Sequence, residues 1–242
     1  MAKRPIVQNG RLTVPLFHGT SSLYHESIQS FGLGGRDAVT DMGIRDAARF
    51  LLAYCDPYRQ QEDWLLPVSG CENVAADPAN DRLSNGWCFN FRYGGTYVSA
   101  SSETASVYAS GQGVKGGEAL NEVLNLAKLL SVHIPSIYDS NHLARLIRFS
   151  QTPAKPMVVE ARDVDVTSLR AEQGGSIFEI LERMEYASEE ESSYDGCVQQ
   201  ENFELTTALG SNQLRFHIPR KVKEYDEIGC SRELLILDPF VP

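Results

Sequence analysis

Three short segments of the chain carry residues whose types could bind a nucleotide-like ligand. The first contains His18, Gly19 and Thr20, and the second contains Tyr97, followed eleven residues later by Tyr108. The third runs from Asn212 to Pro219. A histidine ring can hydrogen-bond a ribose hydroxyl. A glycine beside it lets backbone groups approach a planar amide closely, and two aromatic rings can hold a flat heterocycle between them. We therefore expect these residues, which are far apart in the sequence, to line one pocket.

These motifs resemble those of the ADP-ribosyltransferase superfamily, in its poly(ADP-ribose)-polymerase-like branch. That branch is marked by a histidine, a tyrosine and a third residue, usually glutamate but sometimes aspartate or glutamine. His18 is similar to the first marker, Tyr97 in Gly-Thr-Tyr is similar to the second, and Tyr108 has the spacing of the family's second stacking tyrosine. The resemblance implies that NAD is the co-substrate. It also implies which residues bind NAD: His18, Gly19, Thr20, Tyr97, Ser99 and Tyr108.

The third marker residue has three candidates. Gln213 precedes Leu-Arg-Phe-His-Ile-Pro, which best resembles the arrangement in bacterial relatives, and we rank it first. Glu204 and Glu233 compete with it, because both open apolar strands as the family's glutamate does. A glutamine can accept a hydrogen bond from a ribose hydroxyl, but it has no negative charge and is a poor base. With Gln213 as the third residue, we expect single transfer rather than chain elongation.

One position departs from the family's pattern. The family often has a serine three residues before the second tyrosine, where its hydroxyl bonds the nicotinamide amide. Here that position is Ala105, and the substitutes in the same segment are Ser99, Ser102 and Ser106.

The resemblance implies a mono-ADP-ribosyltransferase that breaks the bond between nicotinamide and ribose and transfers ADP-ribose to a macromolecular acceptor. The acceptor is a protein or a nucleic acid, and the enzyme would be of the toxin, effector or phage-defence kind, with an antitoxin or regulatory protein as a further partner. Two alternatives stay open. One is a catalytically inactive NAD-binding or protein-interaction module of the same fold, and the other is a tRNA 2′-phosphotransferase-like enzyme.

The elements around these motifs predict an α+β domain. Apolar spacing predicts strands at 12–17, 97–98, 157–161, 203–207, 214–218 and 234–237, and helices near 24–31, 42–54, 102–110, 120–130, 143–147 and 177–184. The resemblance implies a split antiparallel β-sheet core in a single domain, 1–242, with insertions at about 34–93 and 110–156. Residues 55–93 lack clear periodicity and are predicted to be irregular, and 219–228 are predicted to form a helical turn.

Composition limits the other classes of function. The net charge of −10 is uneven, because residues 172–204 hold ten acidic residues and one basic residue, and this segment could bind a partner. The five cysteines are odd in number and form no C-x-x-C pair, so we predict neither a disulfide framework nor a metal site. No signal peptide or membrane-length apolar run is evident. The expected location is the cytoplasm, or a host cell if the protein is a delivered effector.

Overall fold

The computed structural model describes residues 5–76, 94–111, 116–172, 175–187, 198–199, 201–225 and 231–241. The chain divides into two compact units. Unit 1 consists of residues 1–35, 96–114 and 154–242, and unit 2 consists of residues 36–95 and 115–153. The three sequence motifs all lie in unit 1, which therefore contains the candidate site. The segments expected as insertions make up unit 2 to within a few residues at each boundary.

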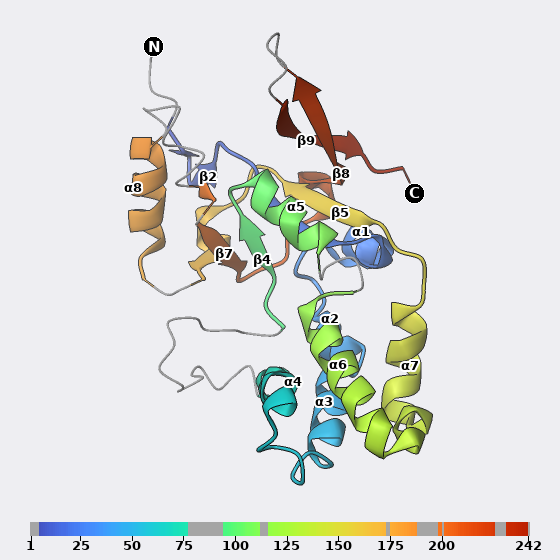
Figure 1. Ribbon diagram of the computed structural model, residues 1–242. Helices are drawn as coiled ribbons and strands as arrows, with labels where there is room; N and C mark the ends of the chain where they lie inside the picture. Colours follow the sequence, from blue (N-terminus) through green and yellow to red (C-terminus); the bar gives the residue numbers. More distant parts are fainter. Residues whose placement is uncertain are drawn as a thin grey trace. The chain divides into compact units, whose positions relative to one another are not determined.

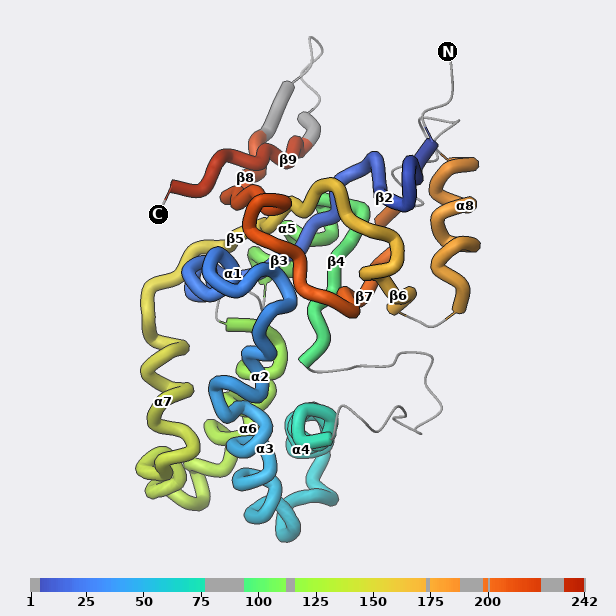
Figure 2. Tube along the Cα trace, turned by 180° about the vertical axis from the view of Figure 1, so that it is seen from behind, coloured from blue at the N-terminus to red at the C-terminus, as the bar shows by residue number. Residues whose placement is uncertain are grey.

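Unit 1 is built on a seven-stranded sheet in which every neighbouring pair is antiparallel. This confirms the α+β prediction in its general form. The strand order is β6-β7-β4-β3-β5-β8-β9 (Figures 1 and 2). In that order the strands are β6 Leu169–Ala171, β7 Asn202–Leu205, β4 Tyr97–Ser99, β3 Leu16–Ser21, β5 Pro156–Ala161, β8 Leu214–Tyr225 and β9 Ser231–Pro239.

The sheet is joined unevenly at its centre. β3 pairs with β5 at six consecutive positions, from Leu16 to Ser21, but with β4 at a single position, where Phe17 faces Ser99. From His18 onward, the two central strands β3 and β4 are therefore not paired. The sheet thus consists of two halves, β6-β7-β4 and β3-β5-β8-β9, which separate next to the His-Gly-Thr motif.

The two faces of the sheet are covered differently. One face packs on the main core of unit 1, which includes Leu16, Val98, Val159 and Phe203. Helices α1 (His25–Phe31) and α8 (Ile177–Ala187) contribute Ile28 and Met184 among other residues to this core. The opposite face is covered by α5 (Ser102–Ser110), which lies over β3 and β5 (Figure 1). Ser101 caps α5, accepting a hydrogen bond from the Thr104 amide at 3.2 Å.

Short elements complete unit 1. A two-stranded hairpin, β1 (Val7–Gln8) and β2 (Arg11–Leu12), precedes β3. The 3₁₀ helices are η1 (Ser22–Tyr24), η4 (Val166–Ser168) and η5 (Ser211–Gln213). The sequence predicted a strand at 12–17, but the long strand β3 begins at Leu16. His18 lies in the interior of this strand.

Unit 2 is helical and has its own core. Its elements are α2 Ala38–Asp41, α3 Ile44–Leu52, α4 Glu62–Ala75, α6 Glu118–His133, the 3₁₀ helix η3 Pro135–Asp139 and α7 Asn141–Ser150. The prediction that 55–93 is irregular is wrong for 62–75, which form α4 even though Pro67 lies inside it. The spacing that marks α4 is four buried residues on one stripe: Trp64, Val68, Cys71 and Val74. No helix in the described ranges has both the length and the apolar character needed to span a membrane.

The predicted helical turn at 219–228 is also wrong over 219–225. These residues continue β8, and Pro219 pairs with Leu237 of β9. β8 pairs with β5 only as far as His217. Among the described strands, none lies beside that edge of β8 at Pro219. A proline is tolerated at such an edge because its missing N–H interrupts no ladder. Residues 226–230 lie outside the described part of the chain.

Candidate active site

The backbone of Gly19 faces the separation between β3 and β4. The Ser22 amide donates to the Lys155 carbonyl at 2.9 Å, and this bond fixes the phase of the β3–β5 ladder. Because backbone groups alternate from side to side along a strand, the N–H and C=O of His18 point to β5 and those of Gly19 point to β4. β4 pairs with β3 only at Phe17, so Gly19 has no ladder partner there. The N–H donor and the C=O acceptor of Gly19 thus lie side by side, and this arrangement could bind the carboxamide group of a ligand.

His18 is fixed by a hydrogen bond across the same separation. Its Nδ1 lies 2.7 Å from the backbone carbonyl oxygen of Tyr97. A carbonyl only accepts, so Nδ1 must carry the proton. Burial lowers the pKa of His18, although the hydrogen bond to Tyr97 opposes this shift, and the ring is neutral at pH 7. Nε2 then holds a lone pair, so it can accept a hydrogen bond from a hydroxyl but cannot donate one.

Gly19 also allows α5 to pack directly on the sheet. A β-carbon at this position would lie 1.9 Å from the Ala105 carbonyl oxygen and 2.9 Å from the Ala109 nitrogen. No residue but glycine fits there without moving the helix. Ala105 and Ala109 are both buried against this face. The alanine that departs from the family's serine is therefore a packing residue here, and its methyl group supplies no hydroxyl to a ligand.

Tyr97 faces Glu204 directly. Their Cα atoms are register partners between β4 and β7, so both side chains lie on the same face of the sheet. Val98, between Tyr97 and Ser99, points into the main core, and the side chain of Tyr97 therefore points to the face that α5 covers. Glu204 in turn faces Arg170 on β6. This gives one cross-strand row on the α5 face, consisting of Tyr97, Glu204 and Arg170. Gly19 lies on the neighbouring strand β3, where β3 and β4 are no longer paired.

An ion pair holds the carboxylate of this row. Arg170 donates to Oε2 of Glu204 from Nε at 3.0 Å and from Nη2 at 2.5 Å. The Glu204 side chain is 13% exposed and that of Arg170 is 49% exposed. A guanidinium beside this mostly buried carboxylate restricts where the bonded oxygen lies. The row and the neighbouring backbone of Gly19 therefore combine an aromatic ring, a carboxylate and a donor–acceptor pair.

The remaining residues expected to bind NAD lie nearby but in different environments. Tyr108 is on α5, which covers the Tyr97 face, and is 61% exposed. Ser99 is buried, and its Oγ accepts a hydrogen bond from the Ser101 amide at 3.1 Å. Ser106 donates to the Ser102 carbonyl within α5. Thr20 alternates with Gly19, so its side chain is buried on the opposite face, with that of His18.

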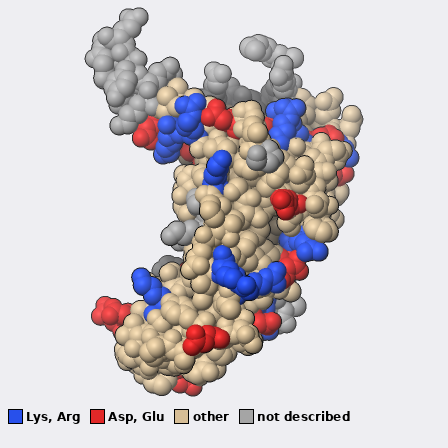
Figure 3. Space-filling model, turned by 90° about the vertical axis from the view of Figure 1, so that its right-hand side faces the viewer, with Lys and Arg blue, Asp and Glu red and all other residues tan. Residues whose placement is uncertain are grey.

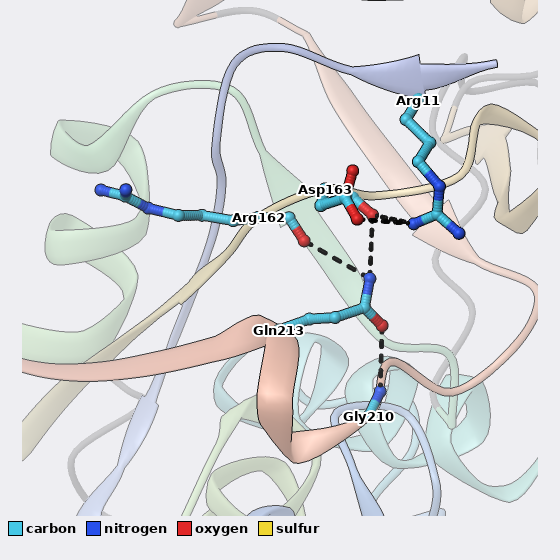
Figure 4. Close-up of polar contacts among 5 residues, drawn as sticks. All are labelled: Arg11, Arg162, Asp163, Gly210 and Gln213. Carbon is cyan, nitrogen blue, oxygen red and sulfur yellow. Dashed lines mark hydrogen bonds and ion pairs between the residues drawn. The ribbon is translucent and has the colours of Figure 1, made fainter. Parts of the chain in front are cut away.

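Gln213 has a role in the loop after β5. Its Nε2 donates to the carbonyl of Asp163 at 2.9 Å and, more weakly, to that of Arg162 at 3.4 Å (Figure 4). Its Oε1 accepts from the Gly210 amide at 3.3 Å. Asp163 has a left-handed backbone, with φ of 55°, and Arg11 also bonds its carbonyl and its carboxylate. The Gln213 side chain thus secures a strained turn, and the strand that follows it, β8, is separated from β4 by β3 and β5.

Glu233 lies farther still from Tyr97. It is on β9, at the edge of the sheet, where its carboxylate pairs with Lys221 at 3.2 Å and is 55% exposed. Of the three candidates for the third residue, only Glu204 is brought opposite Tyr97.

A second polar cluster was not predicted from the sequence. Glu160, in the apolar strand β5, is 6% exposed and accepts a hydrogen bond from Nε2 of His217 at 2.8 Å. Arg162 donates to its other carboxylate oxygen. Burial alone would raise the pKa of Glu160, but the bonds from Arg162 and His217 outweigh it and the pKa is lowered. The His217 side chain is 15% exposed. A charged residue inside an apolar run was the available signal.

His25, the first residue of α1, lies in the interior of unit 1. It is 8% exposed, and its ring contacts those of Phe216 at 4.7 Å and Phe240 at 4.8 Å between centroids. It is therefore a core residue of unit 1. Within the described ranges, no group of three or more His, Cys, Asp or Glu residues could hold a metal ion.

Comparison with known proteins identifies no matching family model, no similar curated protein and no similar solved structure. The functional argument therefore depends on the residues and the geometry described above.

Proposed function

We propose that this protein is an NAD-dependent ADP-ribosyltransferase whose reacting centre is formed by Tyr97 and Glu204 on the α5 face. The backbone of Gly19 and, from the opposite face of the sheet, the side chain of His18 complete it where β3 and β4 separate. The observation that carries the proposal is the register of β4 and β7, which sets Glu204 opposite Tyr97. The sequence motif required a histidine, a tyrosine and an acidic or amide residue in one place. The position of Glu204 opposite Tyr97 supports it, in preference to Gln213, as the third residue.

Each group has a defined part in this proposal. The N–H and C=O of Gly19 bind the carboxamide of nicotinamide, and Tyr97 stacks against its ring, with Tyr108 as the second aromatic from α5. The neutral imidazole of His18 accepts a hydrogen bond from a ribose hydroxyl through Nε2. These contacts hold the dinucleotide so that the bond between the ribose and nicotinamide is exposed to attack.

Glu204 acts on the reacting ribose. The bond from C1′ to the nicotinamide nitrogen breaks, and its electron pair leaves with nicotinamide. Positive charge develops on the ribose, and a carboxylate placed beside it stabilises that charge. The acceptor then bonds to C1′, and its proton passes to Glu204 as general base. A carboxylate supplies the base that a glutamine lacks, so the reason for expecting only single transfer no longer holds. The size of the labelled product measures how many ADP-ribose units are transferred.

The acceptor is a protein or a nucleic acid. On the face drawn in Figure 3, basic and acidic side chains occur side by side, so its charge favours neither acceptor class. Segment 219–223 contains three basic residues and lies on β8, where Arg220 pairs with Asp238 and Lys221 pairs with Glu233. These pairings reduce the positive charge that the segment offers to a nucleic acid.

The test combines two measurements. Purified protein is incubated with NAD labelled in its adenine part, alone and with cell lysate, while nicotinamide release is followed by chromatography. We expect nicotinamide release and a labelled macromolecule from wild type, and loss of both from Glu204→Gln. Protein that is folded by circular dichroism but releases no nicotinamide and labels nothing would contradict the proposal.

A competing function has one specific observation behind it. Ala105 replaces the serine that the family uses to hold nicotinamide, and its backbone occupies the space above Gly19. This favours a module that binds NAD without turning it over. Calorimetry separates the two functions, because binding of NAD without nicotinamide release would identify the inactive module.

A further inference from the structure

The sheet of unit 1 ends in two different edges. At one edge lies β6, which has three residues, and at the other lies β9, which has nine (Figure 2). A strand at an edge exposes a row of backbone N–H and C=O groups that a strand of another chain can bond. A three-residue strand offers a short row, whereas β9 offers a long one. The edge of β9 is therefore where this sheet is best suited to be extended.

The hydrogen-bond phase of β9 identifies the backbone groups at this edge. The amide of Phe240, which follows β9, donates to the carbonyl of Phe216 on β8 at 2.9 Å. Even-numbered residues therefore direct their backbone groups toward β8, and odd-numbered residues direct theirs outward. The outward groups include those of Glu233, Leu235 and Leu237, and no other described strand lies on this side of β9. Each of these three residues offers both a donor and an acceptor to a strand that pairs here.

The free edge of β8 has features that discourage such pairing. Because Phe216 directs its backbone groups to β9, the odd-numbered residues of β8 direct theirs to the other edge. Beyond His217 these residues include Pro219 and Lys221. Proline has no N–H to donate, and lysine at an edge opposes pairing with another strand. β9 instead has four consecutive apolar residues, Leu234–Leu237, all half-buried, and this contrast favours an edge that is paired in the working protein.

We propose that β9 pairs antiparallel with β9 of a second copy of this chain, about a two-fold axis at Leu235. Two-fold symmetry is the commonest symmetry of homo-oligomers, and it brings the same surface of both copies together. The two seven-stranded sheets then form one continuous sheet. This inference does not depend on the proposed function.

The sequence of β9 is self-complementary in this register. Residues that face each other in an antiparallel pair lie on the same face of the sheet, so an axis at a residue continues both faces from one copy to the other. An axis at Leu235 sets this residue opposite itself, and it sets Leu234 opposite the second copy's Ile236. It also sets Arg232 opposite the second copy's Asp238, so that residues of opposite formal charge become register partners.

The two neighbouring registers fit less well. An axis at Leu234 would set Arg232 opposite the second copy's Ile236. An axis at Ile236 would set Leu234 opposite the second copy's Asp238. Neither of them pairs residues of opposite charge along β9, as the axis at Leu235 does.

Cysteine cross-linking tests the register. Facing Cα atoms in a hydrogen-bonded antiparallel pair are about 5.5 Å apart, within the range that a disulfide spans. Leu235→Cys places two cysteines opposite each other on the axis. Leu237→Cys is the matched control, because it lies on the same face but faces the second copy's Glu233, and its two copies are then about 13 Å apart along the strands.

Both cysteine variants are made in a chain in which Cys88, Cys197 and Cys230 are replaced by serine, and Cys55 and Cys71 are buried. After mild oxidation we expect most of the Leu235→Cys protein to migrate as a covalent dimer on a gel run without reductant. The Leu237→Cys protein should migrate as a single chain.

Sedimentation equilibrium measures the assembly without a cross-link. We expect wild type to have the mass of two chains at micromolar concentration. Leu235→Lys sets two lysines opposite each other on the axis, next to Lys221, which already faces position 235 from β8. Since like charges that face each other repel, the dissociation constant should rise by at least about 10-fold. Leu237→Lys sets the same charge opposite the second copy's Glu233, and its dissociation constant should stay within about threefold of wild type.

Three results would each overturn the pairing. They are a wild type that sediments as a single chain, equal cross-linking of Leu237→Cys and Leu235→Cys, and a Leu235→Lys variant that is folded by circular dichroism but dimerises as strongly as wild type. Cross-linking introduces no charge at the axis, so it decides the question if the lysine variant does not fold.

Discussion

The Cα atoms of Tyr97 and Glu204 face each other between β4 and β7, two strands that are more than a hundred residues apart in the sequence. This pairing puts an aromatic ring and a carboxylate on one face of the sheet, next to the point where β3 and β4 separate. The predictions that follow depend on this register and on the packing around it.

Glu204→Gln should lower activity and leave stability unchanged, whereas Gln213→Ala should lower stability and leave activity unchanged. Glu204→Gln removes the charge that stabilises the reacting ribose, and we expect nicotinamide release to fall about 10²- to 10³-fold with the fold unchanged. Gln213→Ala removes the hydrogen bonds to the turn at 162–163, and we expect a loss of about 0.5–1.5 kcal/mol in unfolding free energy with turnover retained. Steady-state kinetics and denaturant unfolding measure the two effects. A Gln213 variant that is fully stable but inactive would restore glutamine as the third residue.

Gly19→Ala should destabilise unit 1. The added methyl group would lie 1.9 Å from the Ala105 carbonyl oxygen, so α5 must move away from β3. We expect a loss of about 1–3 kcal/mol in the free energy of unfolding. The control is Gly210→Ala, where the nearest atom is the end of the Asn212 side chain, which can rotate away. Equal stability of these two variants in a urea titration would show that α5 does not pack tightly on Gly19.

The protonation of His18 should affect stability below neutral pH. Its pKa in the folded state is lowered below the ordinary value of 6.5, mainly by burial, so folding favours the neutral ring. The contribution of His18 is complete above pH 6.5 and decreases as the pH falls from 6.5 toward the folded pKa, because only the unfolded chain then gains a proton. We expect the free-energy advantage of wild type over His18→Asn to shrink across that window. An advantage that is constant from pH 7.5 to pH 5 would contradict this.

The ionised carboxylate of Glu160 should contribute to the stability of the folded state. Its pKa is lowered below 4.5 because the bonds from Arg162 and His217 outweigh its burial. Its contribution is therefore complete above pH 4.5 and is lost as the pH falls through the folded pKa. We expect Glu160→Gln to lower the free energy of unfolding by about 1–3 kcal/mol at pH 7. The melting temperature of this variant should also fall less than that of wild type as the pH is lowered below 4.5. Asp238→Asn, which breaks the exposed pair with Arg220, is the control and should change stability by less than about 1 kcal/mol.

Local patterns in the sequence determined much of the secondary structure. The helices near 42–54, 102–110, 120–130, 143–147 and 177–184 are confirmed within a few residues at each end, because apolar periodicity and capping are properties of neighbouring residues. Ser101 was one of two residues expected to cap α5, and it does so. Helix α4 was missed because a proline, Pro67, lies within it and is not expected inside a helix. Tertiary packing buries one stripe of its residues and stabilises the helix.

The sequence by itself brought His18, Tyr97 and Tyr108 forward as residues of one site, since their types and spacing are visible without a fold. Only the tertiary structure placed Glu204, and neither Gln213 nor Glu233, opposite Tyr97, and only it placed Arg170 beside Glu204. The reason is that strand register is decided by contacts between distant segments. A shift of one residue along β7 would turn the Glu204 side chain to the other face of the sheet, and no local pattern in the sequence specifies that alignment.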